Sequence, residues 1–238
     1  MTRTRILCTA LFLAGAGCKS TTSSENIRTP GIAMGIVVTA PSAESSTVRA
    51  TIQVGDTGVT ATYVNLEGGD RLLASIDGGE EESMQPESEG VYETGFATGA
   101  LDTEFKVNFD RTQDDDAPNS VGNLPGPFDL TALTGSTFSR TEAVEVTWDP
   151  SGSGDPMNIA WNGDCVFLGS ADIPGDSGTY TLAADTIDAT GSDEDPPPTC
   201  DVTLTVTRTR SGTPDTGLDP DSYVRLEQVR STSFTSAP

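Results

Sequence analysis

The chain has 238 residues, a mass of 24.7 kDa and a formal net charge of −23, from 36 acidic and 13 basic side chains. It contains no histidine, which excludes Ser-His-Asp and Cys-His catalysis and any imidazole-ligated metal. Because so negative a chain repels a phosphate backbone, we expect no nucleic-acid partner.

Residues 1–17 predict a signal peptide. Arg3 and Arg5 precede the apolar run Ile6–Ala16. Its 11 residues are fewer than the roughly 20 that span a membrane. They suit the apolar region of a secretory signal, which small residues follow. We therefore expect an exported protein.

Two cleavage sites are open at the end of this segment. Ala14-Gly15-Ala16 fits an A-x-A site, which would release a soluble chain that starts at Gly17. Alternatively, Gly15-Ala16-Gly17-Cys18 resembles the lipobox of bacterial lipoproteins, and the resemblance implies that Cys18 is lipidated. The partner of the mature chain would then be a membrane, reached through the lipid.

The cysteine count favours lipidation. Once Cys8 leaves with the signal peptide, Cys18, Cys165 and Cys200 remain. Lipidation of Cys18 leaves an even pair, whereas a soluble chain would keep an odd thiol in an oxidising compartment. If Cys165 and Cys200 pair, they close a loop of about 36 residues, worth roughly 4 kcal/mol in the chain-entropy model.

Residues 18–34 begin with small polar side chains and predict a flexible tether. Lys19, and no Asp, follows the cysteine. By resemblance to bacterial lipoproteins, that implies the outer membrane or the cell surface. Without lipidation of Cys18, the protein would be periplasmic or secreted.

Alternating apolar and polar residues predict strands through the rest of the chain and little helix. The clearest runs are Val48–Val54, Val59–Tyr63, Phe105–Phe109, Val144–Trp148 and Val202–Thr207. We expect one β-sandwich over 35–111, an acidic Pro/Gly-rich linker over 112–127 and a second sandwich over 128–238. One large sandwich is the alternative, because all-β domains can exceed 200 residues.

Asp176-Ser177-Gly178-Thr179-Tyr180 resembles the D-x-G-x-Y corner of immunoglobulin-like domains. In that corner the Tyr hydroxyl ties a strand to a nearby loop. Trp148 resembles the core Trp of the same domains. The resemblance implies an all-β fold of two antiparallel immunoglobulin-like β-sandwiches. Chance is the plainer explanation of a Tyr that follows a Gly turn.

Asp114-Asp115-Asp116-Ala117-Pro118 resembles the D-x-N-D-N-A-P linker of cadherin-like repeats, whose carboxylates bind calcium between sandwiches. Hard oxygen ligands on a loop suit Ca²⁺. The resemblance implies a calcium site at Asp114, Asp115 and Asp116, and calcium is the one cofactor that the sequence suggests. The alternative is a solvated acidic linker.

Two further groups could contact a partner. Arg208, Arg210, Arg225 and Arg230 either gather into a basic patch for an anionic partner or pair with acids across strands. Trp161 is the best candidate for an exposed aromatic that binds glycans, and its alternative is packing against the disulfide.

The sequence thus favours a non-catalytic cell-envelope lipoprotein with a structural, adhesive or partner-binding role. One alternative is a calcium-stabilised module that binds glycans or proteins. A second is a glycoside hydrolase that uses two carboxylates, although no motif selects a pair.

Overall fold

The computed structural model describes residues 20–55, 61–190 and 198–238. Over these ranges the chain is almost wholly strand, which confirms the predicted all-β class. The helical turns of the described chain are two short 3-10 turns, η1 (Ser24–Asn26) and η2 (Thr29–Gly31). No helix within those ranges is long and apolar enough to cross a membrane.

The strands form three sheets. Sheet A has eleven strands, ordered β1-β4-β3-β2-β18-β17-β14-β15, with β7, β8 and β12 attached to this path. Its strands are β1 (Thr21–Ser23), β2 (Ala33–Ser42), β3 (Ser45–Val54), β4 (Thr62–Asn65), β7 (Gln85–Ser88), β8 (Val91–Phe96), β12 (Thr137–Ser139), β14 (Met157–Gly163), β15 (Val166–Ile173), β17 (Cys200–Ser211) and β18 (Tyr223–Ala237).

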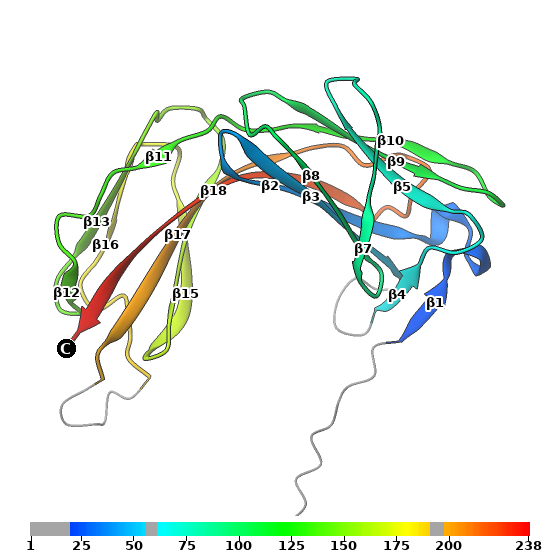
Figure 1. Ribbon diagram of the computed structural model, residues 1–238. Coiled ribbons are helices and arrows are strands. Elements are labelled where there is room, and N and C mark those ends of the chain that lie inside the picture. The colour runs from blue at the N-terminus through cyan, green and yellow to red at the C-terminus, as the bar shows by residue number, and fades with distance from the viewer. Residues whose placement is uncertain (1–19, 56–60, 191–197) are drawn as a thin grey trace, which may run out of the picture.

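Two smaller sheets lie on sheet A. Sheet B has the order β10-β9-β5-β6 and sheet C the order β11-β13-β16. The strands of sheet B are β5 (Arg71–Ile76), β6 (Glu82–Ser83), β9 (Glu104–Asp110) and β10 (Ala117–Asn123), and those of sheet C are β11 (Asp129–Leu130), β13 (Val144–Asp149) and β16 (Thr179–Leu182). The molecule is an arch, with sheet A on its inner side and sheets B and C on its outer side (Figure 1).

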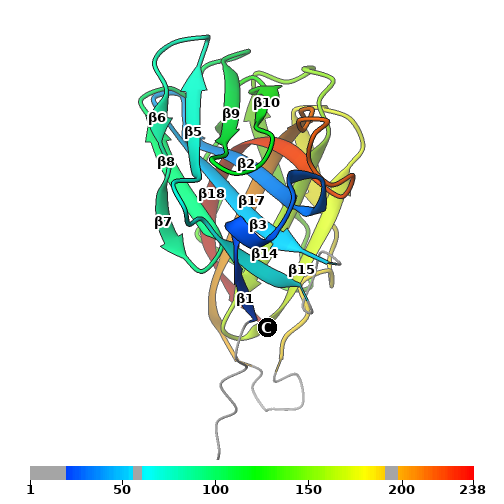
Figure 2. The same ribbon diagram turned by 90° about the vertical axis from the view of Figure 1, so that its right-hand side faces the viewer.

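Each smaller sheet encloses its own core against sheet A, so the chain forms two sandwich lobes. Lobe 1 lies under sheet B, and its core includes Ile36, Val48 and Phe109. Lobe 2 lies under sheet C, and its core includes Trp148 and Leu204. Turned by 90°, the arch shows β5, β9 and β10 lying across the strands of sheet A (Figure 2). The predicted two sandwiches correspond to these two cores.

The hairpin β17–β18 belongs to both lobes. The first part of β18 pairs in parallel with β2, from Tyr223 opposite Gly35 to Gln228 opposite Ala40. Its last residues pair in parallel with β12, while β17 runs antiparallel beside it. The sequence assigned all of 128–238 to the second sandwich, whereas the start of β18 lies in the core of lobe 1. Alternation of apolar and polar residues identifies a strand, but it does not identify the strands with which that strand pairs.

The segment 112–127 differs from the predicted linker, because β10 occupies Ala117–Asn123. This strand pairs with β9, with Val121 opposite Lys106 and Gly122 opposite Phe105. Its sequence contains Pro, Gly and Asn, which are poor strand formers. Pairing with β9 therefore decides its conformation.

The predicted tether 18–34 is ordered over its described part. β1 pairs with β4, and Arg111 holds the residues that follow β1; residues 21–31 are here called the N-terminal segment. The Arg111 guanidinium donates to the carbonyls of Ser24 (2.9 Å) and Ile27 (3.0 Å) and to the Thr29 hydroxyl (3.1 Å). Small polar residues predicted flexibility, but a buried guanidinium supplies the donors that their backbone needs. The signal peptide and Cys18 lie outside the described residues.

Candidate functional site

The inward-facing positions of β17 and β18 change character where the two lobes meet. Alternate residues of a strand share one face of the sheet. On this face the lobes contribute apolar side chains, Val202, Leu204 and Val206 in lobe 2 and Val224 and Leu226 in lobe 1. Between them the same face carries Arg208, Arg210, Gln228 and Arg230. The alternation of core-facing and solvent-facing residues therefore continues along both strands, while the core-facing side chains change from apolar to polar.

These polar side chains hold the segment that joins sheet B to sheet C, residues Leu124–Phe128, here called the crossing segment. Arg208 Nη1 donates to the Gly126 carbonyl (2.7 Å), and Gln228 Nε2 donates to the Pro125 carbonyl (3.1 Å). Buried carbonyls outside a sheet need such donors, because an unpaired polar group is costly. The polar positions thus complete the hydrogen bonds of irregular backbone.

Arg208 also forms a buried ion pair with Asp176, at 2.8 Å and with side-chain exposures of 1% and 0%. The carboxylate accepts two more hydrogen bonds, from Trp148 Nε1 (2.6 Å) and from the Ser153 backbone (2.8 Å). Burial raises the pKa of Asp176, but these donors and the charge of Arg208 outweigh it, so its pKa lies below the ordinary value. Burial lowers the pKa of Arg208, against the attraction of Asp176 and Asp155.

Arg210 is saturated by two acids. Its Nε and Nη2 donate to the two oxygens of Asp155, at 3.0 and 2.9 Å, and its Nη1 donates to Asp102 at 2.7 Å. The Asp155 hydrogen bond is the main reason that the pKa of Arg210 is raised. Arg225 pairs with Glu227 on its own strand, at 2.6 Å. The structure thus gathers three of the four predicted arginines and leaves Arg225 on the other, solvent-exposed face of sheet A.

Beside these arginines lies a cavity of about 580 Å³, here called the junction cavity. Its lining includes Ala43 of the β2–β3 turn and Asp129 at the start of β11. Figure 1 shows the β2–β3 turn and β11 near the top of the arch. Its wall is largely apolar, with contributions from Ala43, Leu101, Pro127, Phe128 and Pro150. Arg208, Arg210 and Arg230 line the same space.

Arg230 differs from its neighbours, because no carboxylate of the described chain lies within ion-pairing distance of it. It donates to the carbonyls of Ala40 (3.0 Å) and Val229 (2.9 Å) and to Gln228 Oε1 (3.3 Å). Its guanidinium carbon lies 5.4 Å from the centre of the Phe128 ring. Burial lowers the pKa of Arg230, and more distant carboxylates oppose the shift.

The three predicted calcium ligands serve the turn between β9 and β10. Asp116 Oδ1 accepts a hydrogen bond from the Arg111 backbone (2.7 Å), and Asp114 Oδ1 accepts one from the Asp115 backbone (2.8 Å). The Asp115 carbonyl accepts one from Thr29 (2.6 Å). Within the described ranges, no three acidic or cysteine side chains converge as a metal site. Calcium binding stays a prediction.

The immunoglobulin-like corner is held by its first residue. Trp148 is buried in the core of lobe 2, as predicted, and donates to Asp176. Tyr180 is half-buried against that core, and its hydroxyl makes no hydrogen bond within the described part of the chain. The sequence selected Tyr180 for the role that Asp176 performs.

Trp161 is buried in the core of lobe 2, which corrects its choice as the candidate for an exposed aromatic and agrees with the alternative, packing near the disulfide. Its indole lies over Gly169, where an added Cβ would come within 2.3 Å of the ring. Cys165 belongs to the same core and forms the predicted disulfide with Cys200, at a Cα–Cα distance of 5.8 Å.

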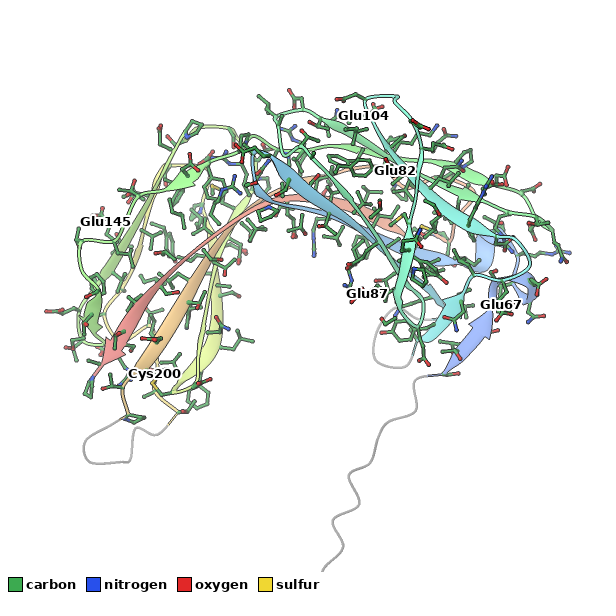
Figure 3. The ribbon with its side chains drawn as sticks, in the orientation of Figure 1. Glu67, Glu82, Glu87, Glu104, Glu145 and Cys200 are labelled. Carbon is green, nitrogen blue, oxygen red and sulfur yellow. A yellow bond between two sulfur atoms is a disulfide. The ribbon has the colours of Figure 1, made fainter. Side chains whose placement is uncertain are left out.

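Glu82, Glu87, Glu104 and Glu145 lie on four different strands, β6, β7, β9 and β13. Figure 3 shows Glu82, Glu87 and Glu104 spread over lobe 1 and Glu145 on the outer side of lobe 2. Asp155 lines the junction cavity, but both of its oxygens accept hydrogen bonds from Arg210.

No protein-family model and no curated protein matches the chain. Among solved structures, the Yersinia pseudotuberculosis adhesin InvE is 14% identical, with a TM-score of 0.26, over 87% of this chain and 60% of the adhesin. The titin domains Z1Z2, solved in complex with telethonin, are 13% identical, with a TM-score of 0.27, over 86% of this chain and 97% of theirs. The chain thus spans less than two thirds of the adhesin. Structural similarity at these TM-scores carries no argument about function.

Proposed function

We propose that this protein is a non-catalytic, lipid-anchored component of the bacterial cell envelope with a structural, adhesive or partner-binding role. The observation that carries the proposal is the hairpin β17–β18, which is shared by both lobes. Domains joined by a flexible linker would share no strand. A shared hairpin, closed by buried arginine contacts, gives the lobes one fixed orientation, as a scaffold needs.

The disulfide supports a place outside the cytoplasm. Cys165 and Cys200 lie in lobe 2, close to its core. Such bonds persist in oxidising compartments and are rare in the reducing cytosol. The same compartment suits the predicted signal peptide.

A lipid on Cys18 would hold lobe 1 close to the membrane. The first strand of the described chain, β1, starts at Thr21, three residues beyond Cys18 in the sequence. Three extended residues span about 10 Å at most. The short reach, rather than the long flexible tether expected from sequence, would place lobe 1 at the bilayer surface.

Metabolic labelling with an alkyne fatty acid tests the anchor, comparing the full chain with Cys18→Ser in bacterial cells. We expect label and membrane association for the native chain and neither for Cys18→Ser. Equal labelling of the two chains would remove the anchor from the proposal.

Spin labels on Glu82→Cys and Glu145→Cys test the fixed orientation, because these residues lie on opposite lobes (Figure 3). One narrow distance distribution is expected from a shared hairpin, and a broad one would contradict the scaffold.

A screen of glycoside substrates tests the hydrolase alternative. If the protein hydrolyses a glycoside and Asp155→Asn abolishes that hydrolysis, the hydrolase would replace the proposed non-catalytic role.

A further inference from the structure

The junction cavity combines one available cation with an apolar wall. We propose that it binds a small monocarboxylate with an apolar body, whose carboxylate pairs with Arg230 and whose body contacts Leu101, Pro127 and Phe128. The inference concerns the folded chain itself and does not depend on the lipid anchor.

Arg230 has donors to spare. A guanidinium carries five N–H groups. Arg230 uses three of them, toward Ala40, Val229 and Gln228. Two remain without an acceptor in the described chain, which is the number that a carboxylate accepts in a bidentate pair. Arg208, which lines the cavity and has a side chain 1% exposed, likewise has an Nε–H without a hydrogen-bond partner.

The acids around the cavity are engaged by other arginines, apart from Asp129 and Glu44, whose charges act on Arg230 from a distance. Asp176 is held by Arg208 and Asp155 by Arg210. Asp129 lines the cavity and is exposed, without forming an ion pair with Arg230. Its charge and the strongly acidic chain disfavour a dianion such as phosphate. A single negative charge is the most that one unpaired arginine compensates.

The wall requires more of the ligand than a charge. A volume of about 580 Å³ falls within the roughly 300–1,000 Å³ typical of small-molecule sites. Leu101 is 57% exposed at this wall. An apolar body would remove such surface from water, at about 25 cal/mol per Å². The shared chemistry is therefore a carboxylate beside an apolar group, either as a free acid or as the C-terminus of a peptide.

Isothermal titration of the purified chain at low salt tests this proposal, with 4-phenylbutyrate as the probe and its neutral amide as the matched control. We expect the acid to bind at least about ten-fold more tightly than the amide, because charged hydrogen bonds are worth about 1.5–3 kcal/mol. Equal binding of acid and amide, or no binding of either, would overturn the proposal.

Two variants locate the site. Arg230→Gln should weaken binding of the acid about ten-fold or more, whereas Arg225→Gln, on the same strand but outside the cavity, should leave it unchanged. Leu101→Asp changes only an exposed wall residue and should also weaken binding, which keeps the test valid if Arg230→Gln fails to fold. Unchanged binding in Leu101→Asp would place the ligand elsewhere.

Titration with a dipeptide distinguishes the two candidate ligands, a free acid and the C-terminus of a peptide. The dipeptide Ala-Phe is compared with its C-terminal amide and with 4-phenylbutyrate. Tighter binding of the free dipeptide than of 4-phenylbutyrate assigns the site to peptide C-termini, and the reverse order assigns it to free acids.

Discussion

Replacing Arg208 by methionine removes the guanidinium that ties the crossing segment to lobe 2. Four acceptors lose their donor, namely the carbonyls of Gly126 (2.7 Å), Pro127 (3.4 Å) and Pro150 (2.7 Å) and the Asp176 carboxylate (2.8 Å). Removing one partner of a buried ion pair costs about 3–5 kcal/mol. Asp176 keeps two other donors, and the cavity can admit water to the freed carbonyls. We therefore expect a loss of about 3–5 kcal/mol in the free energy of unfolding, not the sum of four separate losses.

Urea unfolding measured by two signals gives the assay. Both tryptophans lie in lobe 2, so their fluorescence reports that lobe, while circular dichroism reports strands of both lobes. Because β17 and β18 are shared, the two transitions of the native chain should coincide. Arg225→Met is the control, since it breaks a more exposed ion pair of the same hairpin and should cost at most about 1 kcal/mol.

A double variant separates the ion pair from the rest of the change. In Arg208→Met with Asp176→Asn, no buried carboxylate is left unpaired, so the loss should be smaller than the sum of the two single losses by about 0.5–3 kcal/mol. If Arg208→Met costs no more than Arg225→Met, or if the two unfolding signals of the native chain separate, the reasoning about the shared hairpin fails.

Four further outcomes follow from the structure. Arg111→Met should speed amide exchange in the N-terminal segment several-fold more than elsewhere, and uniform exchange would contradict the role of Arg111. Folding lowers the pKa of Asp176, so the ionised carboxylate stabilises the fold above about pH 4, and this contribution is lost as the pH falls through the folded pKa. The difference in free energy of unfolding between the native chain and Asp176→Asn should therefore become smaller in acid. A difference that does not change with pH would refute this. Reduction of Cys165–Cys200 should lower the free energy of unfolding by about 2–4 kcal/mol, measured by tryptophan fluorescence in urea with and without reductant. Millimolar calcium should raise the melting temperature if Asp114–Asp116 bind it, and an unmoved melting temperature would dismiss that site.

Much of the architecture was accessible from sequence, because local patterns encode it. Alternation in Val144–Trp148 and Val202–Thr207 places one face of each run in a core, whatever its neighbours are. The cysteine count likewise selected Cys165 and Cys200 as a pair. These signals depend only on residues near one another in the chain or on simple parity.

The arginines of the junction cavity could be predicted from the sequence only in part. The four late arginines attracted attention because they stand in an acidic chain, and three of them do gather there. Their partners could not be foreseen, since Arg208 meets Gly126, 82 residues away, and Asp176, 32 residues away. Gln228 was not selected from the sequence, although it is a polar residue at a core-facing position of the apolar alternation Val224, Leu226.

The sequence by itself determined strands, their buried faces and the disulfide, because each follows from a local period or a count. The tertiary structure alone decided that β18 joins two lobes and that poor strand formers become β10. It also decided that small polar residues after Ser20 are ordered and that Arg230 borders an apolar cavity. In each case the cause is a donor or strand supplied from far along the chain, which no local pattern records.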